Sequence, residues 1–229
     1  MTNSTRYNKK RFAIKGWERE EHFHFFRSFS QPFFNVHTEV EITTLYQYCK
    51  QNKVSVFLSY LHAATKGVRA TDNFLLRLEG DHVVKYDAVD ISTTVLKDNK
   101  TVSFVHLPFY DELSDFCQNS SEIIEEVKKS NRLFYGYNGP DLVHATTLPW
   151  FKFNGMEHAH LDDADDAIPK LAFGRLEKRD GKILLPMSVR VHHALADGYH
   201  IHLFLQQMEQ YINSGATEDI KVKQKPASD

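Results

Sequence analysis

The sequence is poor in cysteine, with Cys49 and Cys117 as the only two among 229 residues. Two cysteines are too few for the disulfide framework of a small secreted domain, and we expect each to be a small buried apolar side chain. No run of about 18 apolar residues is present, so we expect no membrane-spanning helix. The polar stretch from Met1 to Lys15 also lacks the apolar core of a signal peptide. These absences favour a cytoplasmic protein.

An excess of charge of either sign is missing as well. The 28 Lys and Arg residues nearly balance the 30 Asp and Glu residues, and the formal net charge is -2. Charge therefore gives no reason to expect a nucleic acid or an acidic membrane as a partner. The sequence has no internal repeat and no linker rich in Gly, Ser or Pro, so we expect one domain over residues 1–213. Residues 214–229 are polar and rich in lysine, which predicts a flexible tail.

Apolar residues are plentiful, at 41% of the chain, and their spacing predicts three helices. The first lies near residues 57–68, where Phe57, Leu61, Ala64 and Val68 fall on one face. The second covers residues 111–129. The third covers residues 201–212 and ends near residues 213–215.

Short β-branched runs between polar turns predict strands at residues 82–86, 89–96 and 101–107. Asp180-Gly181 lies between two further runs, 170–176 and 183–191, and predicts a hairpin turn. Helices and strands are interleaved without strict alternation. This pattern indicates an α+β fold in which a mixed β-sheet is flanked by helices.

The stretch from Met187 to His202 contains the residues that most clearly suggest catalysis. An extended apolar run leads into His192 and His193, followed by an Asp-Gly turn and an amphipathic helix. Such a strand–turn–helix corner holds side chains rigidly at a sheet edge, where catalytic groups are common. A neutral imidazole there can take the proton of an alcohol that attacks a thioester. No covalent enzyme intermediate is then required, which fits the absence of a Gly-x-Ser-x-Gly motif. The alternative is a histidine with an ordinary structural role.

Short motifs along the chain strengthen the catalytic interpretation. They are His192-His193-Ala194-Leu195-Ala196-Asp197-Gly198-Tyr199-His200, Trp17-Glu18-Arg19-Glu20-Glu21-His22-Phe23, Tyr86-Asp87-Ala88-Val89-Asp90, Thr146-Thr147-Leu148-Pro149-Trp150 and Leu185-Pro186. Together they resemble motifs of the chloramphenicol acetyltransferase family, over a stretch from about Phe12 to Ile212. The His-x-x-x-Asp-Gly element alone is less specific, because other acyltransferases share it.

The resemblance implies the fold of coenzyme A-dependent acyltransferases, assembled as a homotrimer with active sites at the subunit interfaces. It implies acetyl-CoA as co-substrate and a hydroxyl of chloramphenicol as the acceptor. The second histidine of the pair is the family's general base, and that role falls to His193. Two alternatives on the same fold are an acyltransferase for a different alcohol and a binding protein that lacks catalysis.

The resemblance also implies support for the base. Asp197 matches the aspartate of the motif, and Arg19 matches the arginine that pairs with it. A lone buried carboxylate beside His193 would favour the protonated imidazole, whereas an Arg partner neutralises it. We therefore interpret the pair as structural support. Thr146 matches a serine that hydrogen-bonds the oxyanion of the tetrahedral intermediate, and its hydroxyl suits that role. The alternative is a threonine present for its β propensity.

Binding residues follow from the same matches. For coenzyme A they are Trp150, Lys53 and Arg175, although the two basic residues are equally well interpreted as ordinary surface charges. For the acceptor they are Phe26, Val102, Phe104, His158 and Ala172. All but Phe26 differ in volume or polarity from the residue usual in the family. The sequence therefore leaves the identity of the acceptor open.

Two other functions deserve weight. A dihydrolipoyl acyltransferase core would share the His-x-x-x-Asp-Gly element, but it would begin the motif with Asp-His-Arg and carry lipoyl domains on long linkers. A metal site is suggested by histidine pairs two residues apart, at His22 and His24, His158 and His160, and His200 and His202. Such pairs share a side on a strand but not on a helix. Asp162, Asp163, Asp165 and Asp166 follow the second pair, yet a solvated loop is the favoured interpretation, and we expect no metal.

Overall fold

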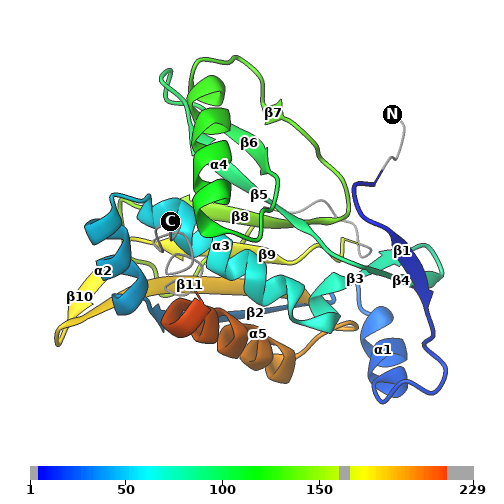
Figure 1. Cartoon of the computed structure of the whole chain (residues 1–229). Helices are drawn as coiled ribbons and strands as arrows, with labels where there is room; N and C mark the ends of the chain where they lie inside the picture. Colours follow the sequence, from blue (N-terminus) through cyan, green and yellow to red (C-terminus); the bar gives the residue numbers. More distant parts are fainter. Residues whose placement is uncertain (1–4, 160–165, 216–229) are drawn as a thin grey trace, which may run out of the picture.

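The computed structural model describes residues 5–159 and 166–215. Within these residues, eight strands form a large mixed sheet and three more form a small antiparallel sheet. Figure 1 shows four helices gathered on one face of the large sheet. They are α2 (Thr43–Asn52), α3 (Val56–Arg69), α4 (Leu113–Lys128) and α5 (Gly198–Gln210). The predicted α+β class with a mixed sheet is confirmed, and these helices flank one of its faces.

Strands from distant parts of the chain alternate in the large sheet. Its order is β2 (Phe33–Glu41), β11 (Lys182–His192), β9 (Lys170–Gly174), β8 (Leu142–Leu148), β5 (Asp90–Leu96), β6 (Val102–Leu107) and β7 (Phe134–Tyr135). The central strands β5, β8 and β9 are parallel to one another. The predicted turn at Asp180-Gly181 is present, with φ of 51° and 79°. It joins β10 (Glu177–Arg179) to β11. The strand predicted at 170–176 is observed as β9, which ends at Gly174, and β10 is a separate short strand that was not predicted.

The predicted helices pack on the sheet through their apolar sides. Leu61, Ala64 and Val68 of α3 are fully buried in the main core. The third predicted helix is observed as α5 followed by one π-helical turn, η2 (Tyr211–Gly215). Cys49 and Cys117 are both buried and free, as expected. Residues 216–229 of the predicted tail lie outside the described residues. No helix in the described chain is long and apolar enough to cross a bilayer.

A small sheet supports the end of β11 that leads into the histidine corner. It contains β1 (Lys9–Phe12), β4 (His82–Tyr86) and β3 (Leu76–Glu79), the last preceded by the short helix η1 (Asp72–Leu75). With α1 (Glu20–Arg27) it forms a second apolar cluster that contains Phe23, Leu76, Leu78, Val83, Ala194 and Leu195. The chain just after His193 is thus packed on a core of its own.

The face of the large sheet opposite α2 to α5 is polar. Because side chains alternate between the two faces of a strand, the register aligns one polar row across six strands. We call it the polar row: His106, Ser92, His144, Lys170, Arg190 and Asn35. Arg190, next to the last residue of the row, lies over the ring of Phe33, with its guanidinium carbon 3.7 Å from the ring centre.

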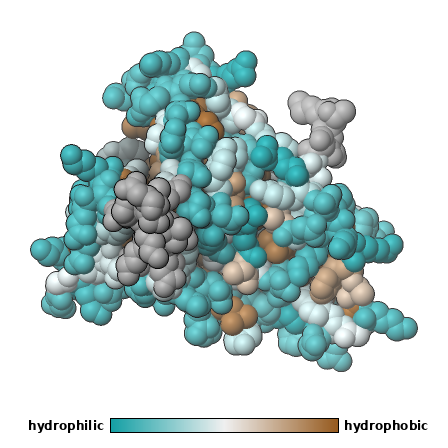
Figure 2. All heavy atoms as spheres, in the orientation of Figure 1, coloured by the Kyte–Doolittle hydropathy of each residue, from teal (hydrophilic) through white to brown (hydrophobic). Residues whose placement is uncertain are grey.

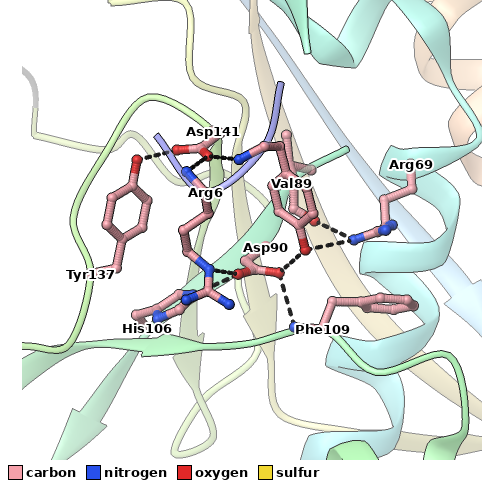
Figure 3. Close-up of polar contacts among 9 residues, drawn as sticks. Arg6, Arg69, Val89, Asp90, His106, Phe109, Tyr137 and Asp141 are labelled. Carbon is pink, nitrogen blue, oxygen red and sulfur yellow. Dashed lines mark hydrogen bonds and ion pairs between the residues drawn. The ribbon is translucent and has the colours of Figure 1, made fainter. Parts of the chain in front are cut away.

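The N-terminal segment is fixed to one end of this polar face (Figure 3). Asp90 is fully buried and accepts hydrogen bonds from Arg6 Nε at 2.8 Å, Tyr7 Oη at 2.6 Å and the Phe109 amide at 2.9 Å. His106 Nε2 lies 2.7 Å from the same carboxylate. A buried carboxylate is tolerated when it is this fully hydrogen-bonded, so the cluster is a structural anchor.

Candidate active site

The corner that carries His193 is held by three separate segments of chain. The His193 amide donates to the carbonyl of Pro32 at 2.7 Å, and Arg19 Nη2 donates to the carbonyl of His193 at 2.9 Å. Asn73 Nδ2 donates to the carbonyl of Leu195 at 2.7 Å. The backbone here is therefore fixed from α1, from the segment before β2 and from η1, which keeps the imidazole in one place.

Three contacts fix the orientation of the His193 ring. It stacks on Phe26 with ring centres 3.7 Å apart, and Phe34 lies on it at 4.9 Å. Its Nδ1 is 3.2 Å from the carbonyl oxygen of Ala196. Because a carbonyl oxygen can only accept, Nδ1 carries the proton of the neutral ring and Nε2 keeps a lone pair. The tautomer fixed in this way is the one a general base needs.

Arg19 and Asp197 form an ion pair beside this ring, as the resemblance implies. Asp197 also caps α5, since its Oδ1 accepts from the Tyr199 amide at 3.0 Å. Burial works to raise the pKa of Asp197, but the charges of Arg19 and His200, with hydrogen bonds from His200 and the Tyr199 amide, outweigh it and lower this pKa. The carboxylate is therefore charged at neutral pH, and the arginine that neutralises it also holds the His193 carbonyl.

A large pocket of about 750 Å³ opens where two central strands part. The pairing of β5 with β8 ends at Thr93 and Ala145, although both strands continue. Beyond that point Thr94 Oγ1 and Thr146 Oγ1 lie 3.1 Å apart. The walls combine residues from the ends of these strands with residues of α3 and α4, so the pocket reaches from the helix-covered face to Thr146.

A small pocket of about 360 Å³ lies on the polar face and also ends at Thr146. Two aromatic rings, Phe104 and Phe134, form one side and stack with centres 5.3 Å apart. The other side is polar, with Ser92, Asn138, His144, His158, Asp166 and Lys170. Thr146 thus stands between the two pockets, where a group delivered through one can meet a molecule held in the other.

The polar side of the small pocket combines a charged pair with neutral histidines. Lys170 and Asp166 form an ion pair whose side chains are 9% and 23% exposed. Burial, together with the charge of Lys170, lowers the pKa of both His144 and His158 to about 4, so both rings are neutral at pH 7. The expectation of a solvated loop is wrong for Asp166, because the register of β8 and β9 brings Lys170 and its partner over the sheet.

The described part of the chain does not bring together side chains that could bind a metal ion. Residues 5–159 and 166–215 contain no group of three or more potential ligands. His22 and His24 lie on α1, and His200 and His202 lie on α5, where residues two apart do not share a side. His160, Asp162, Asp163 and Asp165 lie outside the described residues.

The other predicted site residues are spread over several places. Phe104 and His158 line the small pocket, whereas Val102 lines the large one. Ala172 is fully buried and lies opposite Thr146 in the register. Phe26 lies at the other end of the sheet, on His193. One chain therefore does not bring the five predicted acceptor residues together.

Of the three residues expected to bind coenzyme A, only Trp150 lines the large pocket. Trp150 lines the pocket and is 56% exposed, and its carbonyl accepts from Arg175 Nη1 at 3.3 Å. Lys53 ends α2 in a left-handed conformation with φ of 56° and is not among the lining residues. Lys128 of α4 does line the pocket, and the sequence interpretation missed it because it reads as an ordinary helical surface charge.

His193 and Thr146 lie far apart within one chain. Arg190, Lys170 and His144 are opposite one another across β11, β9 and β8. From that row, His193 lies three residues in one direction and Thr146 lies two residues in the other, because β11 runs antiparallel to β9 and β8. At roughly 3.3 Å per residue the separation along the strands alone is about 17 Å, which excludes direct cooperation within one subunit.

Sequence interpretation missed the polar residues of the small pocket, although a signal was present. Lys170 begins the otherwise apolar strand β9, Arg190 lies within the mostly apolar strand β11, and both side chains are buried. A charged residue inside an apolar strand seldom occurs without a partner or a function. Their alignment with His144 depends on strands that lie far apart in the sequence, so the composition of the pocket was not visible from any one segment.

Comparisons with known proteins agree on one family. A family model described as Chloramphenicol acetyltransferase matches residues 7–209. Chloramphenicol acetyltransferase 3 of Escherichia coli is 26% identical over 90% of this chain and 98% of its own length. Chloramphenicol acetyltransferase of Bacillus pumilus is 26% identical over 85% of this chain and 89% of its own length.

Solved structures extend the likeness to the fold. A chloramphenicol acetyltransferase superimposes with a TM-score of 0.82 at 26% identity, covering 90% of this chain and all of that one. The dihydrolipoamide acetyltransferase of Azotobacter vinelandii superimposes with a TM-score of 0.62 at 15% identity, covering 86% of this chain and 88% of that one. The second likeness shows a shared acyltransferase fold only.

Proposed function

The chain belongs to the chloramphenicol acetyltransferase family of acyltransferases, and we propose that it transfers the acetyl group of acetyl-CoA to an alcohol, with His193 as the general base. The observation that supports this role most directly is the hydrogen bond from His193 Nδ1 to the Ala196 carbonyl. It leaves the lone pair of Nε2 for the hydroxyl of the acceptor. Chloramphenicol, for which the relatives are named, is the first acceptor to test.

The chemistry follows from a base and an oxyanion donor. His193 Nε2 takes the proton of the acceptor hydroxyl as its oxygen attacks the thioester carbonyl. The new C–O bond gives a tetrahedral oxyanion, to which the Thr146 hydroxyl donates a hydrogen bond. When the intermediate collapses, the C–S bond breaks and the protonated His193 returns its proton to the departing thiolate. No enzyme nucleophile and no metal take part in this sequence.

The two pockets suggest separate routes for the two substrates. The large pocket leads from α3 and α4 through the opening between β5 and β8 to Thr146, which suits the long arm of a thioester. Trp150 would contact that arm, and Lys53, Lys128 and Arg175 offer positive charge for the phosphates of coenzyme A. The acceptor would enter from the polar face through the small pocket.

We further propose that the enzyme is a homotrimer with its active sites between subunits. His193 and Thr146 lie too far apart in one chain, so the base must meet the Thr146 of a neighbour. Figure 2 shows apolar residues at the surface near α1. Phe25 on this helix is 60% exposed, and Phe29 just after it is 42% exposed. If this patch packs against the different surface of a neighbour that carries Thr146, the contact is heterologous, and it gives a closed ring when the rotation between neighbours closes.

Free-thiol release from acetyl-CoA tests the proposal directly. Purified protein is assayed with and without chloramphenicol, and the His193→Ala variant is assayed in parallel. Release that depends on both the acceptor and His193 supports the reaction and the base. Release that is equal in the variant would exclude His193 as the base. The single-domain organisation and the cytoplasmic location stay predictions.

A different alcohol is the second candidate for the acceptor. The observation that favours it is the charged pair of Lys170 and Asp166 in the pocket next to Thr146. A molecule with many hydroxyl groups would replace more of the water bound to such a pair than a molecule with a large aromatic group.

A further inference from the structure

The small pocket has the size and the divided lining of a site for one small ring. Its volume of about 360 Å³ is at the lower end for small-molecule sites. One side consists of the stacked rings of Phe104 and Phe134, each about half exposed. The rest of the lining contains seven polar side chains, Thr146 among them, together with Ala145 and Ala159. A molecule that fills this space must present an apolar surface to the rings and polar groups to the opposite side.

The polar side offers donors and acceptors next to one another. Lys170 has three N–H donors, of which one is directed to Asp166, and the carboxylate keeps lone pairs for other donors. His144 and His158 are neutral, so each ring has one donor and one acceptor nitrogen. The His144 ring makes no hydrogen bond to any residue of the described chain. Hydroxyl groups, which both donate and accept, match such an array.

The net charge of the pocket favours an uncharged molecule. The charge of Lys170 is balanced by Asp166. Arg190, the next cation along the polar row, lies over the Phe33 ring and does not line the pocket. A charged molecule would therefore lose its hydration in the pocket without meeting a net opposite charge. A neutral molecule that replaces the displaced water by hydrogen bonds avoids this penalty.

From these observations we propose that the acceptor is a polyhydroxylated ring, a sugar-like polyol, recognised by the Lys170–Asp166 pair and His144, with its apolar ring surface on Phe104 and Phe134. The proposal rests on the acyl transfer proposed above and names its acceptor class. One hydroxyl would reach the Thr146 end of the pocket and receive the acetyl group, while the others bond to the polar side. A site built for hydroxyl groups discriminates strongly against molecules that lack them, because its buried polar groups are left unpaired.

The first experiment compares acceptors with the wild-type enzyme. Thiol release from acetyl-CoA is measured with methyl glycopyranosides of several stereochemistries and myo-inositol, and with chloramphenicol. We expect at least one polyol to exceed chloramphenicol in kcat/KM by about tenfold or more. The acceptor class is wrong if chloramphenicol equals or exceeds every polyol. No His193-dependent release with any acceptor would instead refute the acyl transfer itself.

The second experiment changes the polar side alone. The double variant Asp166→Leu/Lys170→Met removes both charges together, so neither is left unpaired. We expect its kcat/KM ratio of polyol to chloramphenicol to fall by about tenfold or more. An unchanged ratio would overturn the proposal. His158→Leu, expected to shift the ratio in the same direction, serves if the double variant does not fold. Glu41→Gln/Lys182→Met removes an exposed pair of the same sheet and is the matched control.

Discussion

The His193 corner and the small pocket lie at opposite ends of one sheet and satisfy their polar groups differently. At the corner, the Nδ1 of His193, the Nη atoms of Arg19 and the carboxylate of Asp197 all have partners within the chain. In the small pocket, Lys170 and Asp166 have each other as partners, but both also line open volume, as does His144. The difference fits the two roles proposed for them: a corner that is fixed before any substrate arrives, and a pocket whose hydrogen bonds would be completed by the molecule it selects.

The largest effect is expected at the fixed corner. His193→Ala should reduce turnover by about 10²- to 10⁴-fold, the range that general-base catalysis contributes, with the melting temperature nearly unchanged. Steady-state kinetics and thermal unfolding check both parts. His202→Ala, an exposed histidine on the following helix, is the control and should keep wild-type turnover. A His193→Ala enzyme of normal activity would contradict the account of the corner.

At the pocket end, Thr146→Ala should lower kcat by about 10²-fold with little change in KM. The reason is that its hydrogen bond to the oxyanion forms mainly in the transition state. Thr146→Ser keeps the hydroxyl and should retain most of the activity. Separate measurement of kcat and KM is needed, and a change confined to KM would show that Thr146 only helps to bind substrate.

Removal of the Arg19–Asp197 ion pair should lower stability and activity together. Asp197→Asn leaves Arg19 without its carboxylate and should lower the free energy of unfolding by about 3 kcal/mol, near the lower limit for buried pairs because Asp197 is partly exposed. Urea unfolding measures this loss. Lys9→Met removes an exposed pair with Glu79 and should change stability by about 1 kcal/mol or less. Equal effects of the two changes would argue against a special role for the Arg19–Asp197 pair.

The neutral histidines of the small pocket should make the stability of the fold depend on pH. The pKa of His144 is lowered to about 4 by burial and by the charge of Lys170, whereas an unfolded histidine has a pKa of about 6.5. The unfolded chain therefore binds more protons between these values, and stability that is complete above about pH 6.5 is lost as the pH falls toward 4. The slope should reach at most about 1.4 kcal/mol per pH unit for this residue. Urea unfolding from pH 4 to 7 should show a shallower slope in His144→Gln than in His202→Gln. Identical slopes would exclude His144 as a source.

The contrast between the two ends also explains what the sequence could predict. His193 and Asp197 are four residues apart in one strand–turn–helix motif, so local pattern and resemblance together located the corner. The helix near 57–68 and the strand at 82–86 were predicted because their apolar spacing is regular. Strand β8 was not predicted, because His144 and Thr146 interrupt its apolar pattern on the polar face.

The composition of the small pocket could not be predicted from the sequence, for a different reason. Its polar side is produced by the register of β8 with β9, which places His144 opposite Lys170. The predicted acceptor positions Val102 and Phe26 were assigned one by one, and the structure puts them in different places. Contacts of this kind arise only when distant strands pair, and local sequence patterns carry no information about that pairing.

The central claim is that one active site takes His193 from one subunit and Thr146 from the next. Mixing His193→Ala with Thr146→Ala protein, after dissociation and reassembly, tests it most directly. Random assembly of equal amounts into closed rings should give about one quarter of the sites both residues, and so about one quarter of wild-type turnover. The account predicts this recovery from two nearly inactive parents. Activity of the mixture no higher than the average of its parents would contradict a shared site.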